Sequence, residues 1–192
     1  MAVNLNVRFV TQLGIGGHVA GAVPRDDPTG CWYASASMVS YYFEAGPRMG
    51  LPELFKRDLG DGLLGHHATG SGPANLLSAS HHDLLAQREH LEPVAHCAED
   101  HTYSLDELEV LLRTRGPIFF YWMKRHGGSS YGHASVIIGT DRSGIVYHDP
   151  ENAPSSRMTI AEFNAVRQVW KYALMQRRTA GGVAARRRMF ER

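Results

Sequence analysis

The spacing of hydrophobic residues changes about half-way along the chain, and the two halves predict different secondary structure. In the stretch CWYASASMVSYYF, residues 31–43, apolar side chains recur every three or four positions and cover more than one side of a helix. Helices that are apolar on several sides are normally buried. We therefore predict a central, buried helix that begins at Cys31.

Two further segments have the spacing of amphipathic helices. Residues 73–88 carry leucines on one side, and residues 103–117 carry a more regular leucine stripe. In the second segment, Ser104 followed by Glu107 is the sequence of a capping box, in which each side chain binds the other residue's backbone N–H. A Gly-Pro pair then ends the predicted helix.

Short apolar or alternating segments are typical of strands, and most of them follow these helices. A five-residue loop, TDRSG, joins two of them into a hairpin, and Thr159 with Glu162 marks one more short helix. The expected strands lie at residues 4–10, 118–123, 133–139, 145–149 and 169–175. Because helices dominate the first part and strands the second, the pattern favours an α+β fold over an alternating parallel sheet.

The length of 192 residues fits one domain with a core of its own. We assign residues 1–176 to that domain. Residues 177–192 are basic and rich in Gly and Ala, so we expect a flexible tail. Glycine-rich stretches at 14–30 and 60–72 are expected to be loops, the second of them mobile.

Composition and charge narrow the function classes. A net charge of +1 provides no field that would attract nucleic acid, so we expect no nucleic-acid partner. The chain shows no leader-like segment and no apolar run that could span a membrane. We therefore expect synthesis in the cytoplasm without a cleavable signal peptide. Export would then require a secretion system that does not depend on such a peptide.

Cys31 is placed where a reactive thiol is expected. A helix N-terminus carries a partial positive charge from its unpaired N–H groups, and this charge stabilises a thiolate. The alternative is that Cys31 is a small buried hydrophobic residue. A disulfide with Cys97, the other cysteine, is not favoured, and it would remove the nucleophile.

A histidine partner for such a thiol can be sought in the predicted hairpin. If Gly139 pairs with Ile145 across the TDRSG loop, then Asp149 lies opposite Ser135. His133 is two residues from Ser135 on the same face, so it becomes a diagonal neighbour of Asp149 at roughly 7–8 Å between backbones. A carboxylate at that place can hold an imidazole in one tautomer.

Each of these residues also has a simpler explanation when it is taken alone. A histidine at the start of a strand can be structural, and Asp149 before Pro150 can start a turn. His148 points to the opposite face by strand alternation. Cys31, His133 and Asp149 together, however, form the set of groups needed for nucleophilic acyl transfer.

The same segments resemble papain-like cysteine peptidases. TGCWYASASMV is similar to the segment in which Cys-Trp opens the central helix of that family. YGHASVIIGTD and GIVYHDP resemble the His and Asp segments of its compact bacterial members, which include secreted effector proteases and the leader-peptide peptidases of peptide exporters. FVTQ resembles the family's opening, where a glutamine helps to form the oxyanion hole. The resemblance covers residues 7 to about 175.

The resemblance implies a role for each matching residue. Cys31 would be the nucleophile, His133 the general base and then the acid, and Asp149 the group that orients His133. Gln12 would donate to the oxyanion together with the backbone N–H of Cys31. Gln12 lies 19 positions before Cys31, farther than in the family, and the alternative is a strand-end glutamine that faces water.

The resemblance also implies a two-lobe fold, in which a helical lobe carries the nucleophile helix and an antiparallel β-sheet lobe carries the histidine and the aspartate. An extended protein or peptide substrate would bind in the cleft between the lobes, against Trp32 and Gly132. We expect a monomer, with an inhibitor or immunity protein as a further partner at the cleft. The implied role is that of a bacterial effector or toxin delivered into another cell.

Three other hypotheses stay open. Eleven histidines invite a metal site, but His96, Cys97 and His101 only approach a zinc pattern, so we expect no metal and no cofactor, and most histidines in loops or solvent. Another Cys-His-Asp acyl-transfer enzyme, such as a cell-wall peptide amidase, a deamidase or a transglutaminase, would share the catalytic residues. A degenerate papain fold could also serve for binding alone.

Overall fold

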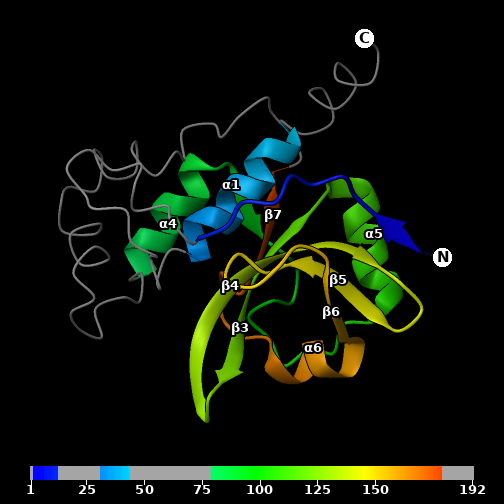
Figure 1. The fold of residues 1–192 in the computed structure, drawn as a ribbon. Coiled ribbons are helices and arrows are strands. Elements are labelled where there is room, and N and C mark those ends of the chain that lie inside the picture. The colour runs from blue at the N-terminus through cyan, green and yellow to red at the C-terminus, as the bar shows by residue number, and fades with distance from the viewer. Residues whose placement is uncertain (1, 13–30, 44–78, 179–192) are drawn as a thin grey trace.

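The computed structural model describes residues 2–12, 31–43 and 79–178 (Figure 1). Its strands are β1 (Val3–Asn4), β2 (Leu91–Pro93), β3 (Ile118–His126), β4 (Ser129–Thr140), β5 (Gly144–His148), β6 (Ser156–Thr159) and β7 (Leu174–Arg177). Its helices are α1 (Cys31–Phe43), α4 (Ala79–Arg88), α5 (Leu105–Arg115) and α6 (Ile160–Val166). The fold is α+β, as the order of the sequence patterns predicted.

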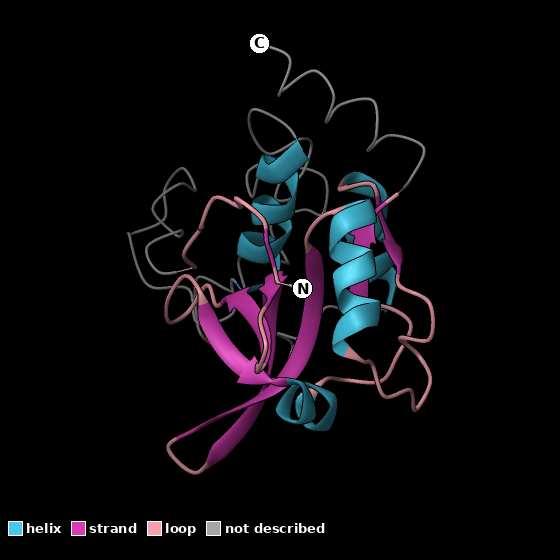
Figure 2. Cartoon of the chain, turned by 90° about the vertical axis from the view of Figure 1, so that its right-hand side faces the viewer, coloured by secondary structure: helices cyan, strands magenta, loops and turns pink. Residues whose placement is uncertain are grey.

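All the strands of this described part belong to one sheet, and every pair is antiparallel. The order is β2-β7-β3-β4-β5-β6, and β1 pairs with β4 off that path. The sheet is strongly twisted, and β3 and β4 form its longest hairpin (Figure 2). β4 pairs with three other strands, β1, β3 and β5.

Helices cover both faces of the sheet (Figure 1). α1 packs against β4 and β3, whereas α5 packs against β4 and β1, and α6 packs against β5 and β6. Alternation along β4 sends Val136 and Ile138 into the core beneath α1 and sends Ile137 into the core shared with α5 and α6. Two hydrophobic cores are thus built on one strand.

Three predicted helix starts, those of α1, α5 and α6, are confirmed. α1 begins at Cys31, and its buried side chains lie on several sides. Ser104 caps α5 and forms the full capping box with Glu107. Thr159 and Glu162 form the same box at the start of α6.

Several predicted strand limits are wrong. The strand expected at 4–10 is formed only at Val3–Asn4; the backbone is irregular from Leu5 on, although the Leu5 N–H still donates to the Ile138 carbonyl at 2.8 Å. The strand expected at 169–175 begins only at Leu174, because a turn closed by the Ala173 N–H on the Trp170 carbonyl precedes it. β2 and β6 were not expected, since they are short and lack an apolar alternation.

The register of the β4–β5 hairpin differs from the prediction near its turn. Gly139 pairs with Val146, not with Ile145, and the loop comprises residues 141–143 alone. A β-bulge in β4 then absorbs one residue, so that Val136 pairs with His148 in the register that was predicted. The bulge therefore restores the pairing at the end of the hairpin that bears the candidate site.

The limits of the domain can be compared with the structure only in part. β7 includes Arg177, one residue beyond the predicted domain end at 176. The loops expected at 14–30 and 60–72, the first turn of the helix expected from residue 73 and the tail after 178 lie outside the described residues, and the two-lobe division stays a prediction.

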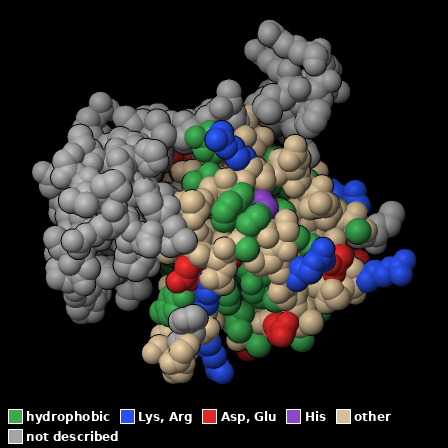
Figure 3. Space-filling view, viewed as in Figure 1, with side chains coloured by type: hydrophobic (Ala, Val, Ile, Leu, Met, Phe, Trp, Pro, Cys, Tyr) green, Lys and Arg blue, Asp and Glu red, His purple; other side chains and the backbone are tan. Residues whose placement is uncertain are grey.

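The described helices and one face of the surface can be examined for membrane-spanning length and for clustering of charge. None of the helices in the described ranges is both long enough and apolar enough to cross a membrane. On the face seen in Figure 3, Lys and Arg side chains are interspersed with Asp and Glu side chains around hydrophobic ones in the described region.

Candidate active site

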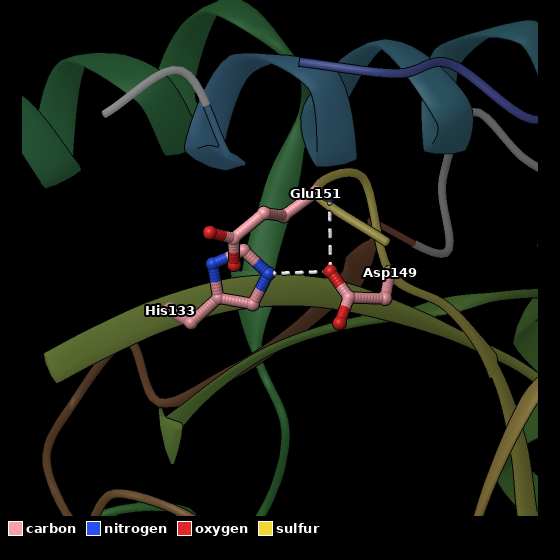
Figure 4. A group of neighbouring side chains, drawn as sticks. All are labelled: His133, Asp149 and Glu151. Carbon is pink, nitrogen blue, oxygen red and sulfur yellow. Dashed lines mark hydrogen bonds and ion pairs between the residues drawn. The ribbon is translucent and has the colours of Figure 1, made fainter. Parts of the chain in front are cut away.

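His133 and Asp149 are in direct contact at the end of the β4–β5 hairpin (Figure 4). His133 lies on β4, and Asp149 directly follows the last residue of β5. The His133 Nε2 and the Asp149 Oδ1 are 2.7 Å apart, and both residues are 1% exposed. The diagonal relation predicted from the hairpin is therefore realised as a buried hydrogen bond.

Asp149 is fixed by donors from three directions. Besides His133, its Oδ1 accepts the backbone N–H of Glu151 at 3.0 Å, and its Oδ2 accepts the Lys124 Nζ at 2.7 Å. Burial alone would raise the pKa of this carboxyl, but the hydrogen bonds and charges of His133 and Lys124 outweigh burial and lower the pKa to about 2. Asp149 is therefore an anion that faces the imidazole.

Cys31 interacts with the same imidazole from the first residue of α1. Burial alone would lower the pKa of His133, but the hydrogen bonds to Asp149 and to Cys31, with the negative charges of both, raise the pKa to about 9. Because Asp149 binds Nε2, the Nδ1 atom is left for the thiol. At neutral pH the geometry thus supports an imidazolium that faces the Asp149 carboxylate on one side and Cys31 on the other.

Gln12 lies beside the loop that carries Asp149. Its backbone N–H donates to the Pro150 carbonyl at 2.9 Å, and the Thr11 hydroxyl donates to the same oxygen at 3.1 Å. Gln12 is only 1% exposed, so the alternative of a glutamine that faces water is wrong. Its donation to an oxyanion stays a prediction.

The two residues expected to bind substrate differ in exposure. Trp32 is 3% exposed and belongs to the core beneath α1. Gly132 is exposed on β4, opposite Met123 of β3, and a Cβ atom there would approach the Gln168 side-chain amide to 3.1 Å. Substrate contacts at Trp32 and Gly132 stay predictions.

Three further polar residues surround the pair and were missed by the sequence analysis. The Lys124 Nζ is 2.6 Å from the Glu151 Oε2 as well as 2.7 Å from Asp149, and the Tyr131 hydroxyl donates to the Glu151 Oε2 at 2.7 Å. A signal was present in the Gly127–Gly128 pair, which is typical of a two-residue hairpin turn. That turn pairs Lys124 with Tyr131 and thereby places both near His133.

Among the described residues, one group has the geometry to hold a metal ion. Single ligand atoms of His133, Asp149 and Glu151 lie within 4.8 Å of one another. The ammonium of Lys124 already binds both carboxylates, so a side chain supplies the cation between them. The donor set therefore fits a catalytic pair with its own counter-ion better than a metal centre.

Three other histidines and the second cysteine have partners outside the His133–Asp149 pair. His82 is buried, with its Nε2 3.1 Å from the Tyr121 hydroxyl, so the expectation of a loop or solvated histidine is wrong for this residue. The His96 Nδ1 lies 2.9 Å from the Glu99 carboxylate, and the His101 Nε2 lies 3.0 Å from the Glu107 carboxylate. Cys97 is a free thiol, as is Cys31, and it donates to the Lys171 carbonyl at 3.2 Å.

Comparison with known proteins identifies the fold and the family. A crystal structure from Bacillus anthracis, described as a C39-like peptidase, superposes with a TM-score of 0.53 over 92% of this chain and 96% of that one, at 15% sequence identity. At this identity the likeness supports the fold alone. The family model of the papain-like cysteine protease AvrRpt2 matches residues 18–168, which is most of the chain. The chain therefore belongs to this family and is a papain-like cysteine peptidase.

Proposed function

We propose that the protein hydrolyses peptide bonds of a protein substrate through an acyl-enzyme on Cys31, with His133 and Asp149 completing the catalytic triad. The observation that carries this proposal is the buried imidazole of His133, which binds Asp149 at 2.7 Å and interacts with Cys31 on its other side. That arrangement supplies a nucleophile, a proton carrier and an orienting carboxylate in one place.

The proposed reaction proceeds in two halves. The Cys31 thiolate attacks the carbonyl carbon, and the His133 imidazolium gives its proton to the departing amine nitrogen, so that the peptide bond breaks and a thioester forms. His133, now neutral, takes a proton from water, whose oxygen attacks the thioester. The acid product leaves, and the thiolate–imidazolium pair is regenerated.

Stabilisation of the oxyanion is assigned to the N-terminus of α1. The backbone N–H of Cys31 lies at the helix start, where N–H groups have no intrahelical partner. Gln12 is the proposed second donor, which is supported by its burial and by its contact with the Asp149–Pro150 segment. Loss of one such donor typically lowers kcat by about 10²–10³-fold.

A substrate panel tests the reaction class. The purified protein and Cys31→Ala are incubated with peptide libraries, peptidoglycan fragments and glutamine donors, and the products are identified by mass spectrometry and an ammonia assay. We expect new peptide termini that appear only with the wild-type protein. Ammonia release or amine incorporation without backbone cleavage would instead identify a deamidase or a transglutaminase. Cleavage restricted to peptidoglycan fragments would identify a cell-wall amidase.

The degenerate-fold hypothesis is tested by the same variant. We expect Cys31→Ala to remove every product while the protein still folds, as judged by circular dichroism. A biological effect that Cys31→Ala leaves unchanged, with no product from any substrate of the panel, would favour a role in binding alone.

We also propose that the enzyme acts as a secreted bacterial effector or toxin and that an immunity or inhibitor protein blocks its cleft. The resemblance of its Cys, His and Asp segments to compact bacterial effector proteases supports this role. Expression inside candidate target cells tests it, because toxicity should require Cys31 and should be relieved by a protein encoded beside the gene. Toxicity that persists in Cys31→Ala would contradict it.

A further inference from the structure

Lys124 is a buried cation beside Asp149, the carboxylate that orients His133 in the proposed triad. It lies on β3, and its side chain is 7% exposed. Its Nζ contacts the Asp149 Oδ2 at 2.7 Å and the Glu151 Oε2 at 2.6 Å. Lysine side chains are almost never buried unless they are paired. This one is placed between two carboxylates, one of which binds the imidazole of His133.

The position of Lys124 follows from the β3–β4 register. Trp122 pairs with His133 and Lys124 pairs with Tyr131, so alternation places all four on one face of the hairpin. Glu151 approaches from the segment that follows β5 and donates its own N–H to Asp149. β3, β4 and the segment after β5 therefore bring one ammonium, two carboxylates and an imidazole into contact.

The geometry points to Lys124 as a positioning residue for the proposed triad, which fixes the Asp149 carboxylate and, with Glu151, sets the charge around His133. With Oδ2 held by the ammonium, Oδ1 is left to face the imidazole Nε2. A carboxylate held at one oxygen only could rotate away from the ring. The inference rests on the proposed function, because Lys124 acts through Asp149 and His133 and not on the substrate.

The charged and polar groups near His133 come from α1, β3, β4 and the segment after β5. α1 supplies Cys31, β3 supplies Lys124, β4 supplies the Tyr131 hydroxyl, and the segment after β5 supplies Asp149 and Glu151. A cation opposes the imidazolium and an anion favours it, so Lys124 and Glu151 act on His133 with opposite signs. Lys124→Met should therefore raise the pKa of His133, and Glu151→Gln should lower it.

This opposition yields a test that needs no substrate. The rate at which iodoacetate alkylates Cys31 is measured against pH by mass spectrometry, because the imidazolium attracts this anionic reagent and its deprotonation slows the reaction. The same titration is followed through the imidazole carbon-bound protons of His133 by NMR. The proteins compared are the wild type, Lys124→Met, Glu151→Gln and the double variant.

The alkaline midpoint is the pH at which the alkylation rate has fallen by half as His133 loses its proton. We expect this midpoint to move up by about one pH unit in Lys124→Met and down by about half a unit in Glu151→Gln. The double variant removes one charge of each sign and should return close to the wild-type midpoint. In a peptidase assay, Lys124→Met should lower kcat by about tenfold with little change in KM, because the Asp149 carboxylate is no longer fixed. Lys124→Arg, which keeps the charge, should keep the midpoint.

Two controls separate this role from a contribution to folding. Arg157→Met, on β6, removes a cation from the ion pair with Asp141, which lies at the β4–β5 turn, away from His133. This variant should leave the midpoint unchanged. Glu151→Gln, whose side chain is 31% exposed, keeps the test informative if Lys124→Met does not fold. Melting temperatures are recorded for every variant.

The outcomes distinguish this inference from the proposed function. Midpoints that stay at the wild-type value in Lys124→Met and Glu151→Gln, together with an unchanged kcat in Lys124→Met, overturn the role of Lys124 and leave the triad in place. Opposite shifts without any peptide cleavage support the role of Lys124 and contradict the peptidase proposal. A wild-type profile with no alkaline fall contradicts the triad and the inference together.

Discussion

His133 and His148 lie on neighbouring strands and are both buried, but they are surrounded by opposite kinds of group. His133 lies between the Asp149 carboxylate and the Cys31 thiol, and its pKa is raised to about 9. His148 donates from Nε2 to the Val7 carbonyl at 2.9 Å and accepts at Nδ1 from a backbone N–H. Burial lowers the pKa of His148, only partly opposed by the hydrogen bond to Val7.

The comparison shows that burial alone does not decide the charge of a histidine. Neutral backbone partners leave the cost of desolvating an imidazolium in place, whereas the interactions of His133 with Asp149 and Cys31 more than offset that cost. Strand alternation separates the two environments, because His148 faces Val7 and Phe9 of the N-terminal segment while Asp149, one residue later, faces His133. One histidine is suited to proton transfer and the other to holding the N-terminal segment.

The largest difference is expected when each histidine is removed. His133→Ala should lower kcat/KM by at least about 10³-fold, because the proton carrier and the partner of the thiolate are lost together. His148→Gln should change kcat/KM by less than about tenfold, since it removes no group of the proposed chemistry. Steady-state kinetics on a cleaved peptide measure both. An equal loss in the two variants would contradict the separation of roles.

Removal of the orienting carboxylate should have the next largest effect. Asp149→Asn is expected to lower kcat/KM by about 10²-fold or more, because the imidazole loses its anion and one constraint on its tautomer. The fall in activity at alkaline pH should also move to lower pH, since the Asp149 carboxylate, which raises the pKa of His133, is removed. Asp141→Asn, at the turn of the same β4–β5 hairpin, is the matched control and should not change the pH at which activity falls.

The charge on His133 predicts a pH dependence of both activity and stability. Activity of the wild type should fall with a midpoint near pH 9, where the imidazolium loses its proton. Because the folded-state pKa lies above the ordinary 6.5, the stabilisation is complete below about pH 6.5 and is lost as pH rises through about 9. Thermal melts across this range measure the stability. An activity that keeps rising above pH 10 would contradict the ion pair.

His148 should show the opposite dependence with a smaller amplitude. Its folded-state pKa is lowered, so its contribution to stability is present above pH 6.5 and is lost as the pH falls toward that lowered value. His148→Gln should cost roughly 1–2 kcal/mol of unfolding free energy at pH 7 through weakened hydrogen bonds, and it should flatten the loss on acidification. Urea unfolding at several pH values measures this. A wild-type stability that does not change between about pH 7 and 5 would contradict the assignment.

The sequence predicts the central helix and the candidate triad better than it predicts the edges of the sheet. The start of α1 at Cys31 and the capping box at Ser104 depend on local patterns, and both are found. The short strands β2 and β6 depend on partners far along the chain, and no local alternation marks them.

The contact between His133 and Asp149 was predicted from a hairpin whose turn was placed incorrectly. Gly139 pairs with Val146, one residue away from the predicted partner, and the β-bulge in β4 restores the predicted register by Val136. Lys124 was missed because the strand pattern alone predicts no register of β3 against β4, although the Gly127–Gly128 turn would have supplied it. The burial of Gln12 depends on contacts with the Asp149 segment, which no spacing within 4–12 reveals.

The alkylation rate of Cys31 at about pH 6, measured site by site in the wild type and in His133→Ala, tests the thiolate–imidazolium pair most directly. At this pH an ordinary thiol is almost fully protonated and reacts slowly with iodoacetate. We predict that Cys31 in the wild type reacts many times faster than free cysteine and that His133→Ala removes this advantage. A rate no faster than that of free cysteine, or one that His133→Ala leaves unchanged, would contradict the triad.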